Sequence, residues 1–128
     1  MAVERLSCGL ELSLPEGEYF ETGDAVRRTV FRTRWWEHLR GKACGEVVFP
    51  PDRRISGAAC SPPSWHRPYP ETAKPVFFGH FAVSDEELAP IAPNVACLDY
   101  GMGKGGRLVA YRWDGEATLM REKFVTAH

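Results

Sequence analysis

Three side chains in the last third of the sequence are of types that can do chemistry at a protein surface. His80 follows the apolar run Val76–Phe78 and one glycine, which lets the backbone turn sharply. A histidine at a strand end can ligate a metal or bind a phosphate group. A lone histidine is nonetheless more often a structural hydrogen-bonding group. Asp99 and Tyr100 end a second apolar run, where the carboxylate could orient His80 and the phenol could meet a substrate. An aspartate before a glycine loop is also ordinary turn chemistry.

Residues 101–106, GMGKGG, satisfy the G-x-G-x-x-G pattern of dinucleotide-binding sites. That pattern works by placing the N-terminus of a helix under a pyrophosphate. The residues that follow, Arg107 to Trp113, are β-branched and aromatic with a period of two, which predicts a strand. We therefore expect a flexible hairpin loop here and no Rossmann-type site.

Arginines alternate with apolar residues from Val26 to Trp36, which predicts one long strand that is arginine-rich on one side. Together with Trp35 and Trp36, these arginines could bind phosphates or nucleic acid. A solvated strand face is the plainer interpretation, because 16 basic and 17 acidic residues give a net charge of -1. We do not expect nucleic acid as a partner.

The four cysteines form no C-x-x-C pair, so a zinc knuckle is not expected. In a reducing cytosol, scattered thiols are most often buried small side chains. His38 and His66 are expected to play structural roles. No run of 18 apolar residues occurs, and the first 14 residues carry three charges, so we expect neither a membrane segment nor a signal peptide. The expected location is the cytoplasm.

The elements that must position these side chains belong to one expected domain, residues 1–128. Its length and its 44% of hydrophobic residues suit a folded chain. Apolar residues at three- and four-residue steps from Val3 to Leu14 predict an N-terminal helix. Seven of the ten prolines predict a loop at 50–75. Beyond it, strands are predicted at 76–81, 95–100, 107–113 and 118–125, with a short helix at 85–88. The expected class is α+β with mostly antiparallel short strands.

Several blocks of the sequence resemble one known family. The blocks 74–80 (KPVFFGH), 92–100 (APNVACLDY) and 105–116 (GGRLVAYRWDGE) resemble the C-terminal end of bacterial calcineurin-like metallophosphoesterases. This branch contains serine/threonine phosphoprotein phosphatases and diadenosine tetraphosphatases. The upstream segments 14–17 (LPEG) and 32–36 (RTRWW) look like the middle region of the same family. The likeness covers nearly the whole chain, and the proline-rich segment is the least matched part.

The resemblance implies a four-layer α/β/β/α sandwich with two divalent metals, often manganese, at the strand ends. A metal-activated water would attack a phosphate-ester substrate in line. His80 matches the G-H motif whose histidine ligates metal. Asp99 and Tyr100 match the strand end beside that site and are candidate catalytic residues. Arg34 is a candidate substrate-binding arginine.

The family's earlier motifs, D-x-H, G-D-x-x-D and G-N-H-E, have no counterpart in this sequence, whose only Gly-Asp pair is Gly23-Asp24. One histidine cannot hold two metals, since each metal needs several donors at fixed geometry. We therefore expect the chain to be the C-terminal portion of the family domain and inactive alone. Its expected partner is the missing N-terminal half or a second copy. The alternative is a non-catalytic protein-interaction module derived from that fold.

Half of a sandwich would also leave the inner face of its sheet uncovered. We expect this face to make the chain prone to aggregate or dimerise. Its members would be Val76, Phe77, Val95, Leu98 and Val109.

Overall fold

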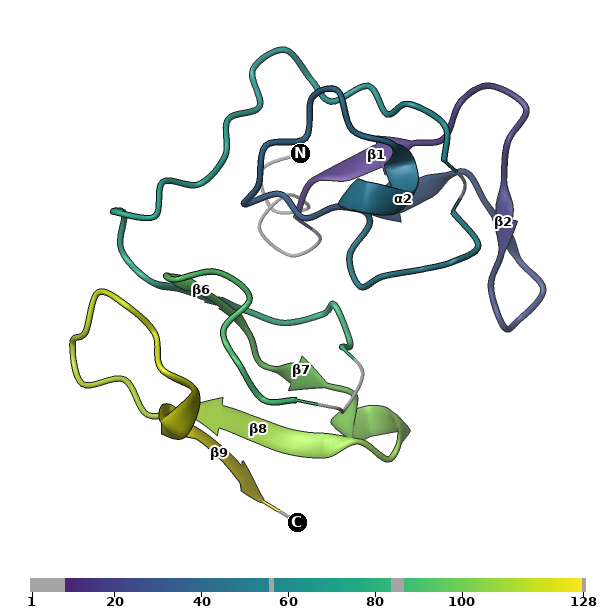
Figure 1. The fold of residues 1–128 in the computed structure, drawn as a ribbon. Coiled ribbons are helices and arrows are strands. Elements are labelled where there is room, and N and C mark those ends of the chain that lie inside the picture. The colour runs from purple at the N-terminus through teal and green to yellow at the C-terminus, as the bar shows by residue number, and fades with distance from the viewer. Residues whose placement is uncertain (1–8, 56, 84–86, 128) are drawn as a thin grey trace. The chain divides into compact units, whose positions relative to one another are not determined.

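The computed structural model describes residues 9–55, 57–83 and 87–127, which form two compact units (Figure 1). The first unit is Met1–Tyr69 and the second is Pro70–His128. The expectation of a single domain stays a prediction.

The first unit is built on two short antiparallel strand pairs. Strand β1 (Glu11–Ser13) pairs with β4 (Val30–Arg32), and β2 (Phe20–Glu21) pairs with β3 (Arg27–Arg28). Leu12 and Phe31 are direct partners across the first pair and are both buried, while the residues beside them on each strand are more exposed. The alternation of the sequence therefore gives one apolar face to this pair, as a half-buried strand requires.

A short helix and a long loop complete the first unit. Helix α2 (Cys44–Val47) buries Cys44 and Val47, and the Glu46 carboxylate accepts a hydrogen bond from the Ala43 backbone N–H at 2.7 Å. These apolar side chains form one core with those of β1 and β4. Its buried members are Leu12, Leu14, Phe31, Leu39, Cys44, Val47, Val48, Ile55 and Cys60.

Two predictions for the first unit were wrong in part. Residues 11–13 form strand β1 and not the end of a helix, because the β4 backbone offers them a hydrogen-bonding partner and their exposure alternates. Residues 1–8 of the predicted helix lie outside the described residues. The predicted strand over 26–36 is divided at Thr29 into β3 and β4, which pair with different strands. The Thr29 carbonyl accepts a hydrogen bond from the Leu14 N–H at 2.7 Å.

The proline-rich segment is a loop, as predicted. Residues 48–55 and 57–75, which connect α2 to β5, contain isolated β-bridges but no helix or strand. At its far end the buried Asn94 side chain donates hydrogen bonds to the carbonyls of Pro70 (2.8 Å) and Ala73 (3.0 Å). Asn94 therefore fixes the chain where it enters the second unit's first strand.

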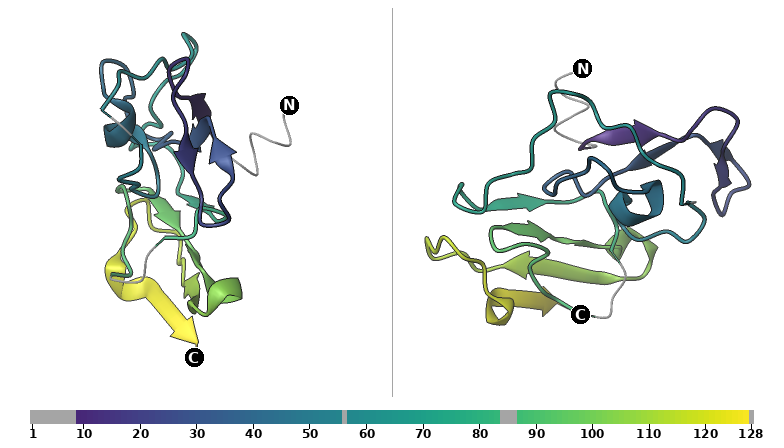
Figure 2. Two further views of the ribbon diagram at one scale, coloured as in Figure 1. Left: turned by 90° about the vertical axis from the view of Figure 1, so that its right-hand side faces the viewer. Right: turned by 45° about the horizontal axis from the view of Figure 1, so that its top comes forward.

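The second unit contains a parallel strand pair and an antiparallel three-stranded sheet. Strand β5 (Val76–Phe78) pairs in parallel with β6 (Val95–Cys97). After Leu98 the chain continues as β7 (Asp99–Tyr100), then the 3-10 turn η1 (Met102–Lys104), β8 (Arg107–Tyr111), the turn η2 (Arg121–Lys123) and β9 (Phe124–Ala127). The sheet order is β7-β8-β9, and Figure 2 shows it from two further sides.

The strand predictions for this unit hold in position but differ in their ends and pairing. The strands predicted at 76–81 and 107–113 stop at Phe78 and Tyr111. The predicted strand 95–100 changes sheet at Leu98, whose N–H bonds the Phe78 carbonyl at 2.8 Å before the chain pairs with β8. The last strand begins at Phe124 and not at Thr118. The parallel β5–β6 pair was not predicted. Of the helix predicted at 85–88, residues 85 and 86 lie outside the described residues, and Glu87 and Leu88 are not helical.

The second unit has its own apolar core, which contains Ala96, Tyr100, Val109, Leu119 and Phe124. A polar cluster holds the connection from β8 to β9. The Tyr111 hydroxyl donates to Glu116 Oε1 at 2.6 Å, and Lys123 Nζ lies 2.9 Å from Glu116 Oε2. Burial raises the pKa of Glu116, but the hydrogen bonds from Tyr111 and Lys123 outweigh it and lower that pKa to about 2.

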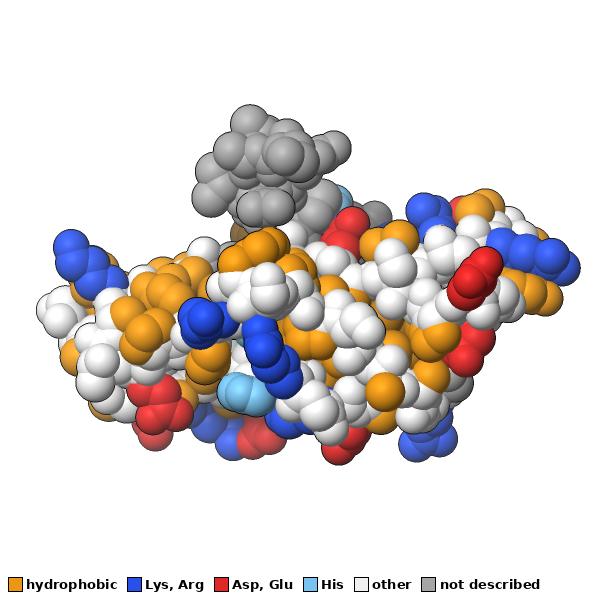
Figure 3. Space-filling model, turned by 90° about the horizontal axis from the view of Figure 1, so that it is seen from above, with side chains coloured by type: hydrophobic (Ala, Val, Ile, Leu, Met, Phe, Trp, Pro, Cys, Tyr) orange, Lys and Arg blue, Asp and Glu red, His pale blue; other side chains and the backbone are white. Residues whose placement is uncertain are grey.

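The class is therefore α+β and rich in small, mostly antiparallel sheets, as the sequence predicts. Among the described residues, no helix has the length and apolar character needed to cross a membrane. Acidic and basic side chains are interspersed on the face drawn in Figure 3.

Candidate functional site at the end of strand β5

An open pocket of about 450 Å³ lies beside the carboxyl end of β5 in the second unit. Strands β5, β7 and β8 and the loops between them supply its walls. The lining residues that bear polar or ionisable groups are His80, Asp99, Tyr100 and Arg107. The pocket therefore brings together three of the four side chains that the sequence singled out.

His80 has an unusual backbone conformation for a residue with a β-carbon. Its φ is 67°, in the left-handed region, and its side chain is exposed at the pocket. The turn after β5 was expected to rest on the freedom of Gly79, but Gly79 does not have a positive φ and the following histidine takes the left-handed conformation instead. Such strain in a non-glycine residue is concentrated at functional sites.

Asp99 holds this turn in place. Its Oδ2 accepts a hydrogen bond from the His80 backbone N–H at 3.0 Å, and its Oδ1 accepts one from the Gly101 N–H at 2.9 Å. One carboxylate thus joins the loop after β5 to the loop after β7. The sequence predicted that Asp99 could orient His80, and the structure shows an orienting bond through the backbone of His80.

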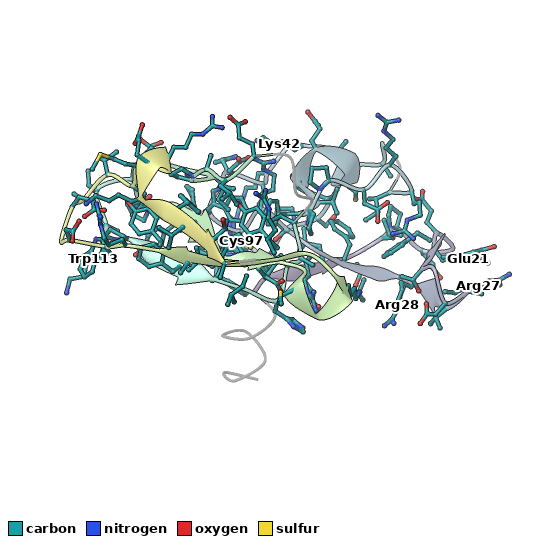
Figure 4. The ribbon with its side chains drawn as sticks, turned by 90° about the horizontal axis from the view of Figure 1, so that it is seen from below. Glu21, Arg27, Arg28, Lys42, Cys97 and Trp113 are labelled. Carbon is teal, nitrogen blue, oxygen red and sulfur yellow. The ribbon has the colours of Figure 1, made fainter. Side chains whose placement is uncertain are left out.

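Tyr100 and Cys97 are buried next to this pair. Tyr100 is 5% exposed and belongs to the core of the second unit. Burial raises the pKa of the Cys97 thiol to about 11, so Cys97 is protonated at neutral pH. Figure 4 shows Cys97 among surrounding side chains. Cys44, Cys60 and Cys97 are all buried and free of disulfides, as predicted for the described cysteines.

Arg107 lines the pocket but was not singled out from the sequence. It is the first residue of β8 and the direct partner of Tyr100 on β7. Its position follows from the hairpin: the glycine loop returns the chain opposite the strand that ends at Tyr100. The alternation of 107–113 therefore predicts the strand that carries Arg107. Only the pairing of that strand with β7 shows that Arg107 is one of its residues that line the pocket.

The glycine-rich loop 101–106 is a hairpin connection, as predicted. A strand follows it, and η1 spans only Met102–Lys104. Gly106 is the position where the loop tolerates no side chain, because a β-carbon there would lie 1.9 Å from the Tyr100 carbonyl oxygen. The Gly106 N–H bonds the Gly101 carbonyl at 2.9 Å. These glycines therefore serve the close approach of two strands.

Arg34, the fourth candidate, lies in the first unit. Its guanidinium forms an ion pair with Glu37, with Nη2 2.8 Å from Oε1, and its Cζ lies 5.6 Å from the centroid of the Trp36 ring. Of the arginines before it, Arg27 contacts Glu21 at 3.6 Å and stacks over Tyr19. Glu21, Arg27 and Arg28 lie together in Figure 4. Partners of this kind are typical of a solvated strand pair.

The described residues do not fit a metal site on their own. No group of three or more histidine, cysteine or carboxylate side chains gathers anywhere in residues 9–55, 57–83 and 87–127. At the pocket, both Asp99 oxygens accept backbone hydrogen bonds, and Cys97 keeps its proton. His80 is therefore the single imidazole that this pocket offers to a metal.

No match was found in a scan against family models, a search of curated proteins or a search of solved structures.

Proposed function

We propose that the chain supplies the histidine-bearing strand end of a metal-dependent phosphoesterase. In this proposal it is the C-terminal part of a calcineurin-like sandwich, and a two-metal site, with manganese or a similar ion, is completed by ligands outside the printed sequence. The chain alone is inactive, because a single imidazole cannot hold two metals.

One observation carries the proposal: His80 is held in a left-handed conformation at the end of β5 by the Asp99 carboxylate. This places an exposed imidazole at the rim of a pocket that also contains a guanidinium, Arg107. An imidazole suits a divalent transition metal, and a guanidinium suits a phosphate oxygen. The described residues alone do not make up the metal site.

The test measures Mn²⁺ binding and phosphatase activity in the full 128-residue chain. Paramagnetic Mn²⁺ should broaden the His80 ring signals in NMR, and His80→Ala should remove this effect. The matched control is His38→Ala, because His38 is also exposed but lies in the first unit. If Mn²⁺ leaves the His80 signals unchanged even when the chain is co-expressed with the polypeptide encoded directly upstream, the proposal is wrong.

Activity is tested with an aryl phosphate and Mn²⁺. The chain alone should show only background hydrolysis. Activity should appear when the chain is co-expressed with the polypeptide encoded directly upstream, and His80→Ala should abolish it. Strong hydrolysis by the isolated chain would contradict the inference that this chain lacks most of the metal ligands.

A non-catalytic interaction module is the second candidate. It is favoured by exposed apolar side chains on one face of the β8–β9 pair, above all Leu108 (55% exposed) and Val125 (51%). In this case His80→Ala would leave partner binding unchanged, whereas Leu108→Thr would weaken it.

A cytoplasmic location is part of the proposal. It is supported by the three buried free thiols, which suit a reducing compartment. A redox-state assay in cell extracts, in which the thiols are trapped by alkylation before lysis, tests it. Oxidised thiols would contradict it.

A further inference from the structure

A second, smaller pocket lies wholly within the first unit. It has a volume of about 240 Å³ and is lined by two short segments, 38–40 and 66–68. These segments contribute His38, Leu39, Arg40, His66, Arg67 and Pro68. Two of the six side chains therefore carry guanidinium groups and two carry imidazoles.

Two guanidinium groups converge on a single backbone oxygen at this pocket. Arg40 Nη2 donates to the Ser64 carbonyl at 2.7 Å, and Arg67 Nη1 donates to the same oxygen at 2.8 Å. Arg67 Nη1 also donates to the His66 carbonyl at 2.9 Å. The two positive charges are thus held well within the screening length of about 8 Å at physiological salt.

No carboxylate of the described residues pairs with either guanidinium. The acidic residue nearest to Arg40 along the chain, Glu37, is already engaged by Arg34 at 2.8 Å and Lys42 at 3.5 Å. The one nearest to Arg67, Glu71, forms no ion pair with it in the described part of the chain. Ser64 and His66 supply only neutral carbonyl oxygens, which satisfy hydrogen bonds without cancelling charge. Two like charges held together in this way repel each other, and a bound anion would remove that repulsion.

The pocket has a fixed frame. His66 is 8% exposed, and its Nε2 forms a 2.9 Å hydrogen bond with the Trp35 carbonyl. Leu39 is 1% exposed and anchors the other segment in the core. The backbones that carry Arg40 and Arg67 are therefore each next to a buried residue, which limits the entropy lost when a ligand orders these side chains.

We propose that this pocket binds a phosphate-type oxyanion through Arg40 and Arg67. A guanidinium has five N–H donors in one plane. The bonds to the Ser64 and His66 carbonyls engage only Nη2 of Arg40 and Nη1 of Arg67. The remaining N–H donors of the two guanidinium groups can bind oxygens of one tetrahedral anion. The planar arrangement of these donors matches the oxygens of a phosphate group. This site does not depend on the proposed phosphoesterase function, because it lies in the first unit and uses no metal.

The test titrates the full chain with inorganic phosphate and, separately, with glycerol 3-phosphate. Ionic strength is kept constant with chloride, and binding is followed by calorimetry. Saturable binding of either anion is expected. The tighter of the two identifies the source as free phosphate or as a phosphate monoester.

Arg40→Gln and Arg67→Gln should each weaken binding by about tenfold or more, the loss expected for one charge-assisted contact. The matched control is Arg28→Gln, which removes the same charge from an exposed strand of the same unit outside this pocket. Its affinity should change less than about twofold, as expected for a screened surface charge.

NMR of the wild-type chain keeps the proposal testable if a variant fails to fold. Phosphate should shift the Nε–Hε signals of Arg40 and Arg67 and leave that of Arg28 in place. Absence of saturable binding overturns the proposal. So does an equal loss in all three variants, which would show a general charge effect, or a shift pattern that spares Arg40 and Arg67.

Discussion

At the scale of single residues, His80 carries a backbone conformation that its β-carbon disfavours. The left-handed region costs a residue other than glycine on the order of 1 kcal/mol. The Asp99 carboxylate offsets part of this cost by accepting the His80 N–H hydrogen bond. A glycine would occupy the same position without this strain.

This strain can be measured by comparing two substitutions that both remove the imidazole. His80→Gly should be more stable than His80→Ala by about 1 kcal/mol, because only alanine retains the β-carbon. Urea unfolding gives both free energies. The control is Ala82→Gly, since Ala82 is exposed and does not have a positive φ; there glycine should lower stability. If His80→Gly is the less stable of the pair, the turn is not strained as described.

The sequence predicted which residues form the site more accurately than it predicted what each residue does there. His80 and Asp99 were predicted to lie together because each ends an apolar strand, and the 3.0 Å hydrogen bond joins them. The role of the Asp99 carboxylate as a brace for two loops could not be predicted, because it depends on a change of sheet at Leu98. Arg107 was missed since nothing in its neighbours distinguishes it before the hairpin is paired.

At the scale of elements, the hairpin between β7 and β8 depends on one close backbone approach. A β-carbon at Gly106 would lie 1.9 Å from the Tyr100 oxygen and 2.9 Å from the backbone of Gly101. Relief would require the loop to move away from β7, which carries the Asp99 brace. By contrast, a β-carbon at Gly103, in the same loop, would meet no atom within 4 Å.

Gly106→Ala should therefore destabilise the chain by about 3 kcal/mol, the upper part of the usual range for single substitutions. The same change at Gly103 is the matched control and should cost less than about 0.5 kcal/mol, as expected for an open surface position. Thermal and urea unfolding check both variants. Equal stability of the two would contradict the steric account.

The element boundaries show where local patterns failed. Alternation predicted strands at 26–36 and 95–100, and each divides because its parts pair with different partners. The first also stops at Arg32, since residues 35–36 form a turn in which the Glu37 N–H bonds the Arg34 carbonyl at 2.9 Å. Pairing is a long-range property, which no local period contains. The apolar spacing from Val3 to Leu14 fits a helix, yet residues 11–13 pair with β4 instead, since tertiary pairing overrides a weak local preference.

At the scale of the whole molecule, the sequence predicted an uncovered apolar face, and the structure changes its membership. Val95 and Val109 are 1% and 7% exposed, so neither is uncovered, and Val109 belongs to the core of the second unit. The exposed apolar residues lie on the other face of the β8–β9 pair from Val109. Leu108, Ala110 and Val125 are exposed, and Ala110 is the direct partner of Val125 across β8 and β9. Strand geometry places all three on one side of the sheet.

This face should make the chain associate with itself at high concentration. An apolar patch on a short sheet whose last strand, β9, pairs on one side only among the described residues favours contact with another copy. The double variant Leu108→Thr and Val125→Thr has a β-branched side chain at both positions, which suits strands, and reduces the apolar area. Sedimentation velocity over a hundredfold concentration range should show weaker association for this variant than for the parent chain. Val26→Thr is the control, because Val26 is 43% exposed in the first unit, and it should behave as the parent does. A parent chain that stays monomeric over that range would show that the face has no affinity for its own copy.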